Sequence, residues 1–253
     1  MLRPRVIPVL TITGSQMVKT RRFGDPIYLG DPFNTVRIFN TKEVDELVIL
    51  DITATSEGRP PDVEFIRDLA GECFMPLSYG GGIDTEESAA AILAAGCEKV
   101  VVNSEFLRRP EFVEELAAAF GSQAVVASVD VGHRRRRGPR VVRTSGGVSF
   151  TDRPPIEWLV ELERRGAGEV LLASVDRDGT AEGYDTDLVR ACSAAVDVPV
   201  IACGGAGSTS DLADVLMAGA AAAAAGRLFV THGRHRAALI SYPESDVIEG
   251  LGR

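Results

Sequence analysis

The residue of this chain best suited to acid–base chemistry is Asp130, which stands near the end of an apolar segment. Residues 125–131 are typical of a buried strand, and Asp130 lies one position before its end. Burial disfavours the charged form of a carboxyl group, so we expect a raised pKa, closer to neutral pH. Asp130 is therefore the candidate general acid or base. The alternative is a structural carboxylate that caps a loop.

Two glycine turns could bind anions. Residues 75–83 (Met-Pro-Leu-Ser-Tyr-Gly-Gly-Gly-Ile) and 198–207 (Val-Pro-Val-Ile-Ala-Cys-Gly-Gly-Ala-Gly) each form a short apolar segment that stops at glycines ahead of a helical run. Such a turn leaves backbone N–H groups free and lets a ligand approach the backbone closely. Two copies in one chain favour two phosphate sites, although the glycines could serve chain geometry alone.

Further polar and glycine residues stand where other predicted strands end. We expect each glycine turn to share its anion with the residues that follow the next strand. The candidates for phosphate or substrate binding are Asp51, Gly81, Gly82, Asn103, Ser104, Asp178, Gly179, Gly204, Gly205, Gly226 and Arg227.

Four charged residues stand at or near the beginnings of predicted strands: Arg5, Glu46, Lys99 and Glu169. Two are cations and two are anions. Buried charges persist only when they are paired, so these four could form a salt-bridged ring across one end of a closed sheet. The alternative reading of such a ring is a purely structural plug.

Strand and helix signals alternate along the chain, which is typical of a parallel sheet with crossover helices. We expect strands at residues 5–12, 46–52, 75–79, 99–103, 124–131, 169–174, 198–203 and 220–225. We expect helices at 34–40, 62–73, 86–95, 111–120, 155–165, 187–195 and 211–218, with a last helix around 232–241. A small hairpin is expected from 140–144 and 148–150, with Gly146 and Gly147 between them.

The two halves of the chain repeat one another. Gly81 and Gly205, Asp51 and Asp176, and Gly96 and Gly219 are separated by nearly the same number of residues. Eight strand–helix units in two similar halves predict a single (β/α)₈ barrel over residues 1–253, with half-barrels of roughly 1–122 and 123–253. A doubly wound open sheet is the alternative, but it gives no reason for the repeat. In a barrel, the loops that follow the strands all lie at one mouth.

The repeat also aligns the first strand of each half. Thr11 then occupies the position that corresponds to Asp130. Threonine cannot exchange protons near neutral pH. A mechanism with two carboxylates is therefore unavailable from these two positions.

Composition restricts the class of protein. A net charge of −9 and a pI near 5.0 argue against nucleic-acid binding, and the basic run at 133–137 is interpreted as a solvated loop. No apolar run is long enough to cross a membrane, and residues 1–12 lack the layout expected of a signal peptide. Four cysteines and three histidines show no metal-ligand spacing. We expect a cytoplasmic protein with reduced thiols and with neither metal nor cofactor.

Six segments together carry a resemblance to a known family. They are Asp-Glu-Leu-Val-Ile-Leu-Asp-Ile at 45–52, Tyr-Gly-Gly-Gly-Ile at 79–83, Phe-Gly-Ser-Gln-Ala-Val-Val at 120–126, Arg-Gly-Ala-Gly-Glu at 165–169, Asp-Arg-Asp-Gly-Thr at 176–180 and Gly-Gly-Ala-Gly at 204–207. Over nearly its whole length the chain resembles the cyclase subunit of imidazole glycerol phosphate synthase.

The resemblance implies a (β/α)₈ barrel that docks a glutaminase on its lower face as a heterodimer. Ammonia would pass through the barrel to a substrate phosphorylated at both ends. Arg5, Glu46, Lys99 and Glu169 match the family's gate at the barrel floor. Glu98 and Gln123 match positions that face the glutaminase, and Lys19 matches the lysine of the mobile first loop.

Some positions depart from the family pattern. The first of the family's two ring-closing aspartates falls on Thr11, and its phosphate-contacting serine near the last strand falls on Arg227. The first loop is short. Residues 30–40 and 239–243 resemble a branch of paralogues that works beside a glutaminase and a sugar amidotransferase and is implicated in making acetamidino groups on surface sugars.

The leading hypothesis is therefore an ammonia-channelling subunit of this paralogue branch. One alternative is a true cyclase of histidine biosynthesis, in which Asp130 acts alone or with Asp51 or Asp178. The other is a scaffold without catalytic activity that activates a glutaminase and shields ammonia.

Overall fold

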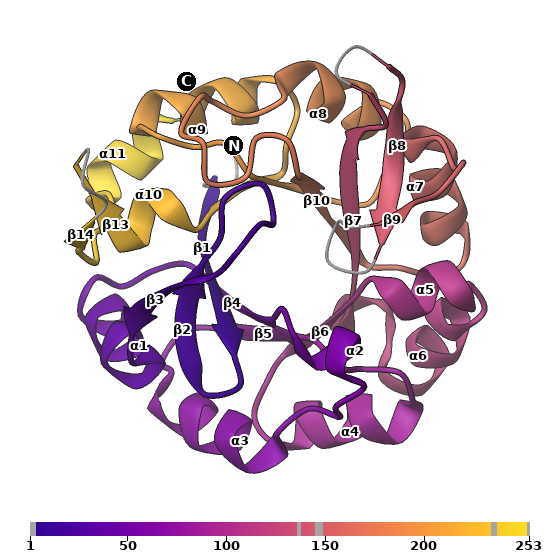
Figure 1. The fold of residues 1–253 in the computed structure, drawn as a ribbon, viewed down its shortest axis with the longest axis horizontal. Helices are drawn as coiled ribbons and strands as arrows, with labels where there is room; N and C mark the ends of the chain where they lie inside the picture. The colour runs from indigo at the N-terminus through magenta and orange to yellow at the C-terminus, as the bar shows by residue number, and fades with distance from the viewer. Residues whose placement is uncertain (1–3, 136–137, 145–148, 234–236, 252–253) are drawn as a thin grey trace.

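Eight parallel strands close into a barrel in the computed structural model, which describes residues 4–135, 138–144, 149–233 and 237–251. In spatial order they are β1 (Arg5–Thr13), β4 (Leu47–Asp51), β5 (Leu77–Gly80), β6 (Lys99–Val102), β7 (Val125–His133), β10 (Glu169–Ser174), β11 (Val200–Cys203) and β12 (Ala222–Ala225). Pairing of β7 with β10 and of β12 with β1 completes the ring (Figure 1). Closure confirms the predicted (β/α)₈ barrel and rules out the open doubly wound sheet.

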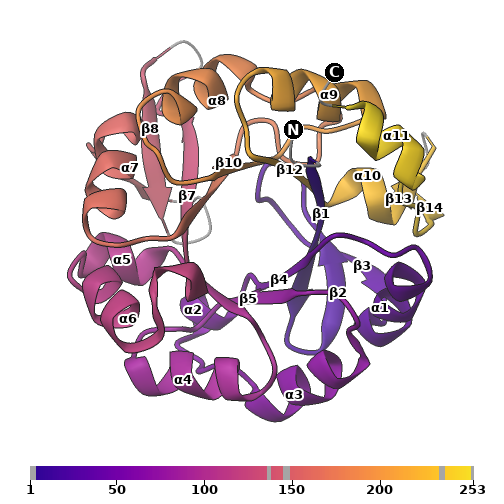
Figure 2. The ribbon, with the colours of Figure 1, turned by 180° about the vertical axis from the view of Figure 1, so that it is seen from behind.

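Helices surround the strands on every side, as the views from both ends show (Figures 1 and 2). They are α1 (Pro32–Thr41), α2 (Ala54–Glu57), α3 (Val63–Glu72), α4 (Glu86–Ala94), α5 (Ser104–Arg108), α6 (Phe112–Phe120), η1 (Ser122–Ala124), α7 (Pro155–Arg164), α8 (Thr186–Ser193), α9 (Thr209–Met217), α10 (Arg227–Val230) and α11 (Ser245–Gly250). The predicted boundaries agree with these to within a few residues except at the C-terminal end.

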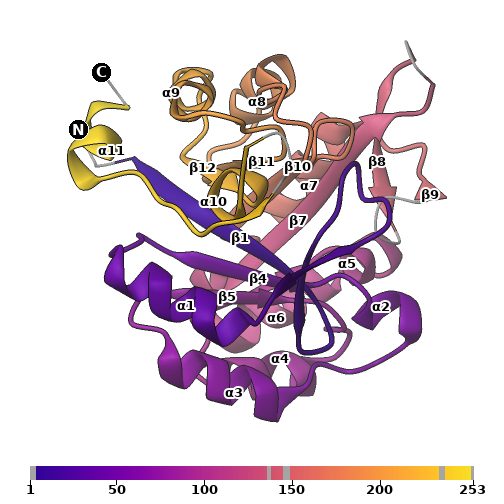
Figure 3. The ribbon, with the colours of Figure 1, turned by 60° about the vertical axis from the view of Figure 1, so that its left-hand side comes forward.

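Short antiparallel strands extend the first strand of each half. β2 (Gln16–Lys19) pairs with β1 and with β3 (Ile27–Gly30), and β8 (Arg140–Thr144) pairs with β7 and with β9 (Ser149–Phe150). The second of these is the predicted hairpin, although its expected Gly146–Gly147 turn lies outside the described residues. In the side view, β8, β9 and α2 lie at one end of the molecule and α11 at the other (Figure 3). We call the end where the strands finish the mouth and the end where they begin the floor.

Alternation along the strands builds two apolar cores. Residues such as Val6, Leu10 and Leu172 point outward and pack under the helices. The interior of the barrel is filled by Ile7, Val9, Val48, Val101, Val126, Leu171, Ile201, Ala222 and Ala224. Because side chains in a strand alternate between two faces, these interior positions fix which neighbours also point inward.

The predicted last helix around 232–241 is wrong. β13 (Thr231–His232) pairs there with β14 (Ala237–Ala238), and the last helix is α11, farther along the chain. Gly233 has a φ of 70°, which turns the chain out of a helical path. The extended segment that follows bonds back to α10, since Ser241 N donates to Phe229 O at 2.9 Å.

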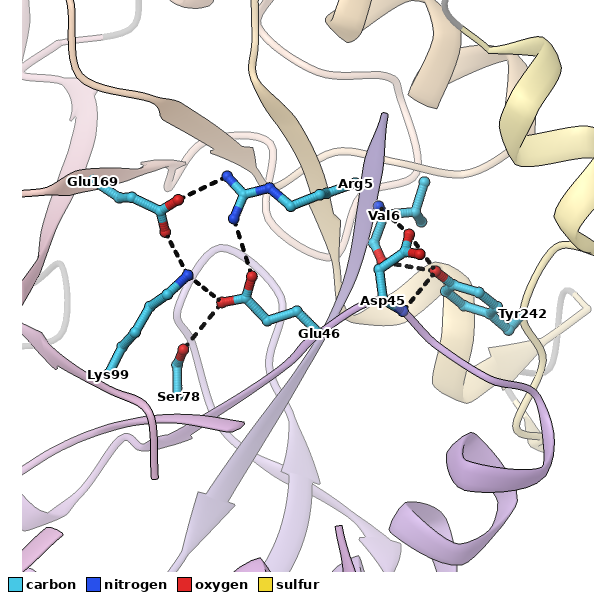
Figure 4. Close-up of polar contacts among 8 residues, drawn as sticks. All are labelled: Arg5, Val6, Asp45, Glu46, Ser78, Lys99, Glu169 and Tyr242. Atoms are coloured by element: carbon cyan, nitrogen blue, oxygen red, sulfur yellow. Dashed lines mark hydrogen bonds and ion pairs between the residues drawn. The ribbon is translucent and has the colours of Figure 1, made fainter. Parts of the chain in front are cut away.

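This extended segment is anchored at the floor by Tyr242. Its hydroxyl lies 2.8 Å from Val6 O and 3.2 Å from a carboxylate oxygen of Asp45, as Figure 4 shows. The ring packs against Phe229, with centroids 5.5 Å apart. The C-terminal segment is therefore tied to the first strand of the barrel.

Two remaining expectations concern cysteines and membranes. All four cysteines are free thiols, and Cys97 and Cys192 are buried. Among the described residues, no helix combines the length and the apolar character needed to span a bilayer.

We predict that Tyr242→Phe lowers the free energy of unfolding by about 1–3 kcal/mol, because it removes a buried hydroxyl from its partners while keeping the ring. Urea unfolding followed by circular dichroism measures the change. Tyr28→Phe is the control, since Tyr28 is 62% exposed and should unfold as the unaltered protein does. Equal midpoints for both variants would contradict an anchoring role for the Tyr242 hydroxyl.

Candidate functional site

The floor of the barrel is built by the inward-facing alternation of four strands. In β1, Arg5 precedes the interior residues Ile7 and Val9 by the two-residue spacing of a strand. Glu46 stands in the same relation to Val48, Lys99 to Val101, and Glu169 to Leu171. The four charged side chains therefore enter the barrel at its lowest layer.

These side chains form a closed ring of alternating charge (Figure 4). Arg5 contacts Glu46 at 3.1 Å and Glu169 at 2.8 Å. Lys99 contacts the same two carboxylates at 3.0 and 2.8 Å. The predicted salt-bridged ring is confirmed. Each carboxylate contacts both cations. The negative charge of Glu46 is therefore compensated, although Glu46 is only 3% exposed.

Ser78 adds a member that the sequence did not single out. Its hydroxyl donates to Glu46 Oε1 at 3.1 Å. Ser78 is 1% exposed, and its side chain points into the barrel from β5. The alternation of inward and outward residues along this strand could have predicted that direction from the sequence. The ring is therefore stabilised by a hydrogen bond from β5 as well as by its salt bridges, because β5 lies between β4 and β6.

At the mouth, Asp130 continues the inward alternation of β7 from Val126. Asn103 does the same beyond Val101 of β6, and its amide donates to Asp130 Oδ2 at 2.7 Å. The Oδ1 atom of Asn103 is buried without a hydrogen-bond partner. Anion binding by Asn103 stays a prediction, and its contact in the structure is with the candidate acid–base residue.

Burial raises the pKa of Asp130 to about 7. The hydrogen bond from Asn103 and the charge of Arg143 lower this pKa, while the negative charge of Asp178 raises it. Loss of solvation is the largest cause, so the predicted direction and its reason are confirmed. A carboxyl group with this pKa can both accept and donate a proton near neutral pH.

Thr11 lies inside the barrel beside β2. Its hydroxyl donates to Val18 O at 2.6 Å, and the residue is 9% exposed. The hydroxyl therefore fastens the β2–β3 hairpin to β1. Thr11 supplies no titratable group to the mouth.

Lys19 and Asp178 are brought together by the β2–β3 hairpin. Lys19 Nζ lies 3.0 Å from Asp178 Oδ1, and both side chains are almost fully enclosed. Thr20 Oγ1 donates to the other carboxylate oxygen at 3.2 Å, and Arg22 N donates to Asp178 O at 2.9 Å. The loop after β2 is thereby held against the loop after β10.

The remaining second-half candidates gather around the same point. Arg227 Nη1 donates to Gly179 O at 2.9 Å. A Cβ on Gly226 would come within 3.2 Å of Lys19 Nζ, so Gly226 lets that lysine approach the end of β12. The structure thus brings together Lys19, Asp178, Gly179, Gly226 and Arg227.

The two glycine turns have closely similar backbones. Gly81 has a φ of 122° and Gly205 a φ of 119°, both in the region that favours glycine. A Cβ on Gly81 would lie 2.4 Å from Asp51 O, and one on Gly205 would lie 2.2 Å from Gly183 O. Chain geometry therefore requires glycine at both turns, whether or not an anion binds there.

Some backbone donors of these turns are already engaged. Gly82 N donates to Thr55 Oγ1 at 3.3 Å. Beyond Gly204 and Gly205, the N–H groups of Gly207 and Ser208 donate to Asp211 Oδ2 at 2.8 and 2.9 Å. Phosphate binding at the turns stays a prediction.

Asp51 acts locally. Its Oδ1 accepts from Thr53 N at 3.0 Å and Ala54 N at 3.1 Å, and Arg59 contacts Oδ2 at 3.3 Å. These contacts fix the short α2 after β4. A part for Asp51 in substrate binding stays a prediction.

Glu98 and Gln123 lie at the floor, just before β6 and β7. Both are exposed, and Gln123 Nε2 donates to Phe120 O at 3.1 Å. Their position is compatible with the predicted docking of a partner, which stays a prediction. No cluster of metal-ligating side chains is present in the described part of the chain.

The chain is similar to known proteins over nearly its full length. The family model "Histidine biosynthesis protein" matches residues 5–235. The chain is 48% identical over 250 residues to a protein of Pseudomonas aeruginosa named putative imidazole glycerol phosphate synthase subunit hisF2, with 98% of this chain and 99% of the relative covered. It is 43% identical over 252 residues to a putative imidazole glycerol phosphate synthase subunit HisF of Leptospira interrogans, with 99% of each covered.

A third relative carries the same name without the word putative. The imidazole glycerol phosphate synthase subunit HisF of Acidobacterium capsulatum is 45% identical over 224 residues, with 88% of each chain covered. These similarities confirm the resemblance drawn from the sequence motifs.

We predict that Asp130→Asn raises the free energy of unfolding at pH 8 but not at pH 4. The pKa rises from 3.8 in the unfolded chain to about 7 in the fold, so the folded state is penalised as pH rises through this window. The asparagine carries no such penalty, and the gain at pH 8 should be roughly 2–4 kcal/mol.

Urea unfolding of both proteins between pH 4 and pH 8 measures this difference. Asp187→Asn is the control, because the Asp187 side chain is 81% exposed. A difference between Asp130→Asn and the unaltered protein that stays constant across the whole range would refute the raised pKa.

Proposed function

This chain belongs to the histidine biosynthesis protein family, and on that premise we propose that it is the ammonia-accepting barrel of a glutamine-dependent synthase. A glutaminase subunit would dock at the floor and release ammonia there. The barrel would conduct the ammonia to a phosphorylated or sugar-derived substrate at the mouth. The acceptor we propose is a sugar that receives an acetamidino group, with a sugar amidotransferase as a further partner.

The observation that carries this proposal is the closed ring of Arg5, Glu46, Lys99 and Glu169 directly below the barrel interior. Removing four charges largely from solvent is unfavourable, and well-packed apolar residues often fill such a space with equal or better stability. A ring of charges on the floor therefore favours a role beyond stability. Above it, most interior side chains are apolar, with Ser128 between Val126 and Asp130, and such a route suits a small neutral molecule.

The mouth supports chemistry on the arriving ammonia. When the nitrogen of ammonia forms a bond to an electrophilic carbon, it must lose a proton. Asp130, with its pKa of about 7, is suited to accept that proton, and Asn103 holds the carboxylate in place. Arg227, whose Nη1 donates to Gly179 O, supports binding of an anionic substrate nearby, whereas Lys19 is paired with Asp178.

The position of Thr11 favours an acceptor other than the histidine-pathway substrate. Ring closure in the cyclase family relies on two aspartates, as the resemblance implies. Here the hydroxyl of Thr11 is committed to Val18 O. Transfer of ammonia without ring closure needs fewer proton transfers, which one carboxyl group can serve.

A genuine cyclase is the second candidate, and Asp178 is the observation in its favour. Its charge raises the pKa of Asp130, so the two carboxyl groups lie close enough to interact. Asp178 could act as the second carboxylate if the hairpin that carries Lys19 moved away. The third candidate, a non-catalytic scaffold, predicts that no side chain at the mouth affects the reaction.

We predict that Lys99→Met and Asp130→Asn act on different steps of the reconstituted complex. Lys99→Met removes the cation shared by Glu46 and Glu169, so ammonia released by glutaminase should reach the mouth at least about five-fold less efficiently. Supplied ammonium salt should restore product formation, because it enters at the mouth. Asp130→Asn should reduce product from either source.

Product formed per glutamine hydrolysed, compared with product formed from ammonium salt, measures the two effects. Loss from both sources in Lys99→Met would contradict a conduit at the floor. Unchanged product in Asp130→Asn would favour the scaffold.

We predict that Thr11→Asp does not create efficient ring closure, because the acceptor differs. The purified variant with ammonium salt and the histidine-pathway substrate gives the measurement, with Thr13→Asp, two residues farther along β1, as a matched control. An increase in ring-closing rate of about a hundred-fold or more would instead support the cyclase, since a positioned acid or base contributes 10²–10⁴-fold, roughly.

A further inference from the structure

A cavity of about 160 Å³ lies against the outer side of the barrel wall, where α8 approaches the β7–β8 hairpin (Figure 1). Its walls come from the end of β7, the start of β8, the end of β10 and the first turn of α8. Hydroxyl-bearing and charged side chains line it. None of the residues predicted from the sequence for catalysis, ammonia conduction or substrate binding is among them, so this cavity is a separate place on the molecule.

The alternation along the strands places the cavity outside the barrel. Leu172 of β10 packs under the outer helices, and Ser174 lies two residues farther along the same strand. His133 stands two residues beyond Val131, which also packs outside. Arg140 is the direct cross-strand partner of His133, so both side chains lie on one face of the hairpin. The cavity is therefore on the opposite face of the hairpin from the candidate acid–base residue.

Ser174 brings a buried hydroxyl group to the cavity. The residue is only 6% exposed, and it lines the cavity wall. In the part of the chain that the structure describes, no hydrogen bond joins its Oγ atom to another residue. Burying a hydroxyl group without a hydrogen-bond partner is unfavourable, and native proteins leave few such groups. A polar ligand in the cavity would supply the missing partner.

The first turn of α8 adds backbone donors. Asp185 caps this helix by accepting from Leu188 N at 3.1 Å. Thr186 and Asp187, the first two residues of the helix, line the cavity, and their N–H groups have no partner among the described residues. The N–H groups at the start of a helix lack intrahelical acceptors, and the helix dipole favours an anion there. The helix and the serine hydroxyl therefore point independently to a ligand that accepts hydrogen bonds.

Two of the carboxylates beside the cavity are neutralised by arginines. Asp185 accepts two hydrogen bonds from Arg140, at 2.9 and 2.7 Å. Asp187 lies 3.2 Å from Arg190, and its side chain is 81% exposed, so most of it faces solvent. Neither carboxylate is left as an uncompensated charge that would repel an anion.

Arg177 and His133 are the nitrogen-bearing side chains left for a ligand. Arg177 is half-buried, and its Nη1 donates to the backbone oxygen of Glu182 at 2.9 Å. No carboxylate of the described residues forms an ion pair with it. His133 Nδ1 lies 2.8 Å from Asp176 Oδ2. Because a carboxylate only accepts, Nδ1 carries the hydrogen, and Nε2 can accept from a hydroxyl group or, once protonated, donate to an anionic oxygen.

We propose that this cavity binds a phosphate group, at a site separate from the glycine turns and from Asp130. Its donors belong to β7, β10 and α8, with positive charge from Arg177. Donors on different elements suit a tetrahedral oxyanion, whose oxygens point in different directions, better than a planar carboxylate. A cavity needs about 15 Å³ to hold one water molecule, so about 160 Å³ leaves room for such a group. The inference goes beyond the proposed function, because it assigns the chain a second ligand.

The test follows the ring of His133 by NMR. The chain has three histidines, so the His133 ring resonances are assigned by their loss in His133→Gln. Inorganic phosphate is titrated at constant pH and ionic strength. We expect these resonances to shift in a saturable manner. The dissociation constant from this shift should rise about ten-fold or more in Ser174→Ala and in Arg177→Gln, because each variant removes a donor to a charged ligand.

Ser193→Ala is the matched control for the serine variant. Ser193 Oγ is likewise buried without a partner among the described residues, but it stands at the other end of α8. Arg67→Gln, which removes an exposed arginine of α3, is the control for Arg177→Gln. Both controls should bind phosphate as the unaltered protein does. Removing an unpartnered hydroxyl group leaves no donor unsatisfied, so both serine variants should remain folded, which far-UV circular dichroism verifies.

Two further probes identify the source of the phosphate group. A response to inorganic phosphate but not to glycerol 3-phosphate supports a site for the free ion, and a response to both supports a site for phosphate esters. His133 resonances that phosphate leaves unmoved, or equal dissociation constants in Ser174→Ala and Ser193→Ala, would overturn the proposal. Acetate bound as tightly as phosphate would overturn the assignment to a phosphate group. These measurements involve neither ammonia nor turnover, so their outcome is independent of the proposed function.

Discussion

The parallel pairing of β7 with β10 closes the sheet, and the arrangement at both ends of the molecule depends on that closure. In a closed sheet, every second residue of each strand points to one axis. A charge at the first inward position of a strand therefore meets charges from the other strands. Arg5, Glu46, Lys99 and Glu169 are far apart in sequence, but closure of the sheet brings them together as ion-pair partners.

The same alternation gives the barrel a polar floor, an apolar interior and a polar mouth. The apolar layer separates the two polar ends. At the floor, low polarity strengthens the attraction among the ring members and makes an unpaired member costly. At the mouth, it raises the pKa of Asp130 to about 7, which the hydrogen bond from Asn103 only partly offsets. One property of the interior thus accounts for a rigid ring at one end and a titratable carboxyl group at the other.

The two halves differ in what their hairpins carry. On the first strand of the chain, β2–β3 brings Lys19 onto Asp178, and Thr11 is used to hold that hairpin. On the first strand of the second half, β8 brings Arg143 next to Asp130, and the charge of Arg143 lowers the pKa of that carboxyl group. A symmetric framework therefore supports an asymmetric mouth.

The sequence by itself determined the barrel, its eight strands, the ring of charges and the burial of Asp130. These follow from local signals: apolar runs of strand length, glycines at turns, and charges at fixed positions relative to those runs. It failed at the predicted helix around 232–241, where an Ala- and Leu-containing stretch looks helical but the described residues form the β13–β14 pair and Tyr242 is attached to Val6 and Asp45. The similar φ angles of Gly81 and Gly205 agree with the repeat that the spacing indicated.

Only the tertiary structure decided which polar groups bond to which. Asn103 contacts Asp130, and Asp178 is engaged by Lys19 and Thr20. Partners of this kind come from strands and loops separated by long stretches of chain, and their identity depends on the rotation of each strand about the barrel axis. Local patterns fix the face on which a side chain lies, whereas its partner across the barrel is fixed by closure.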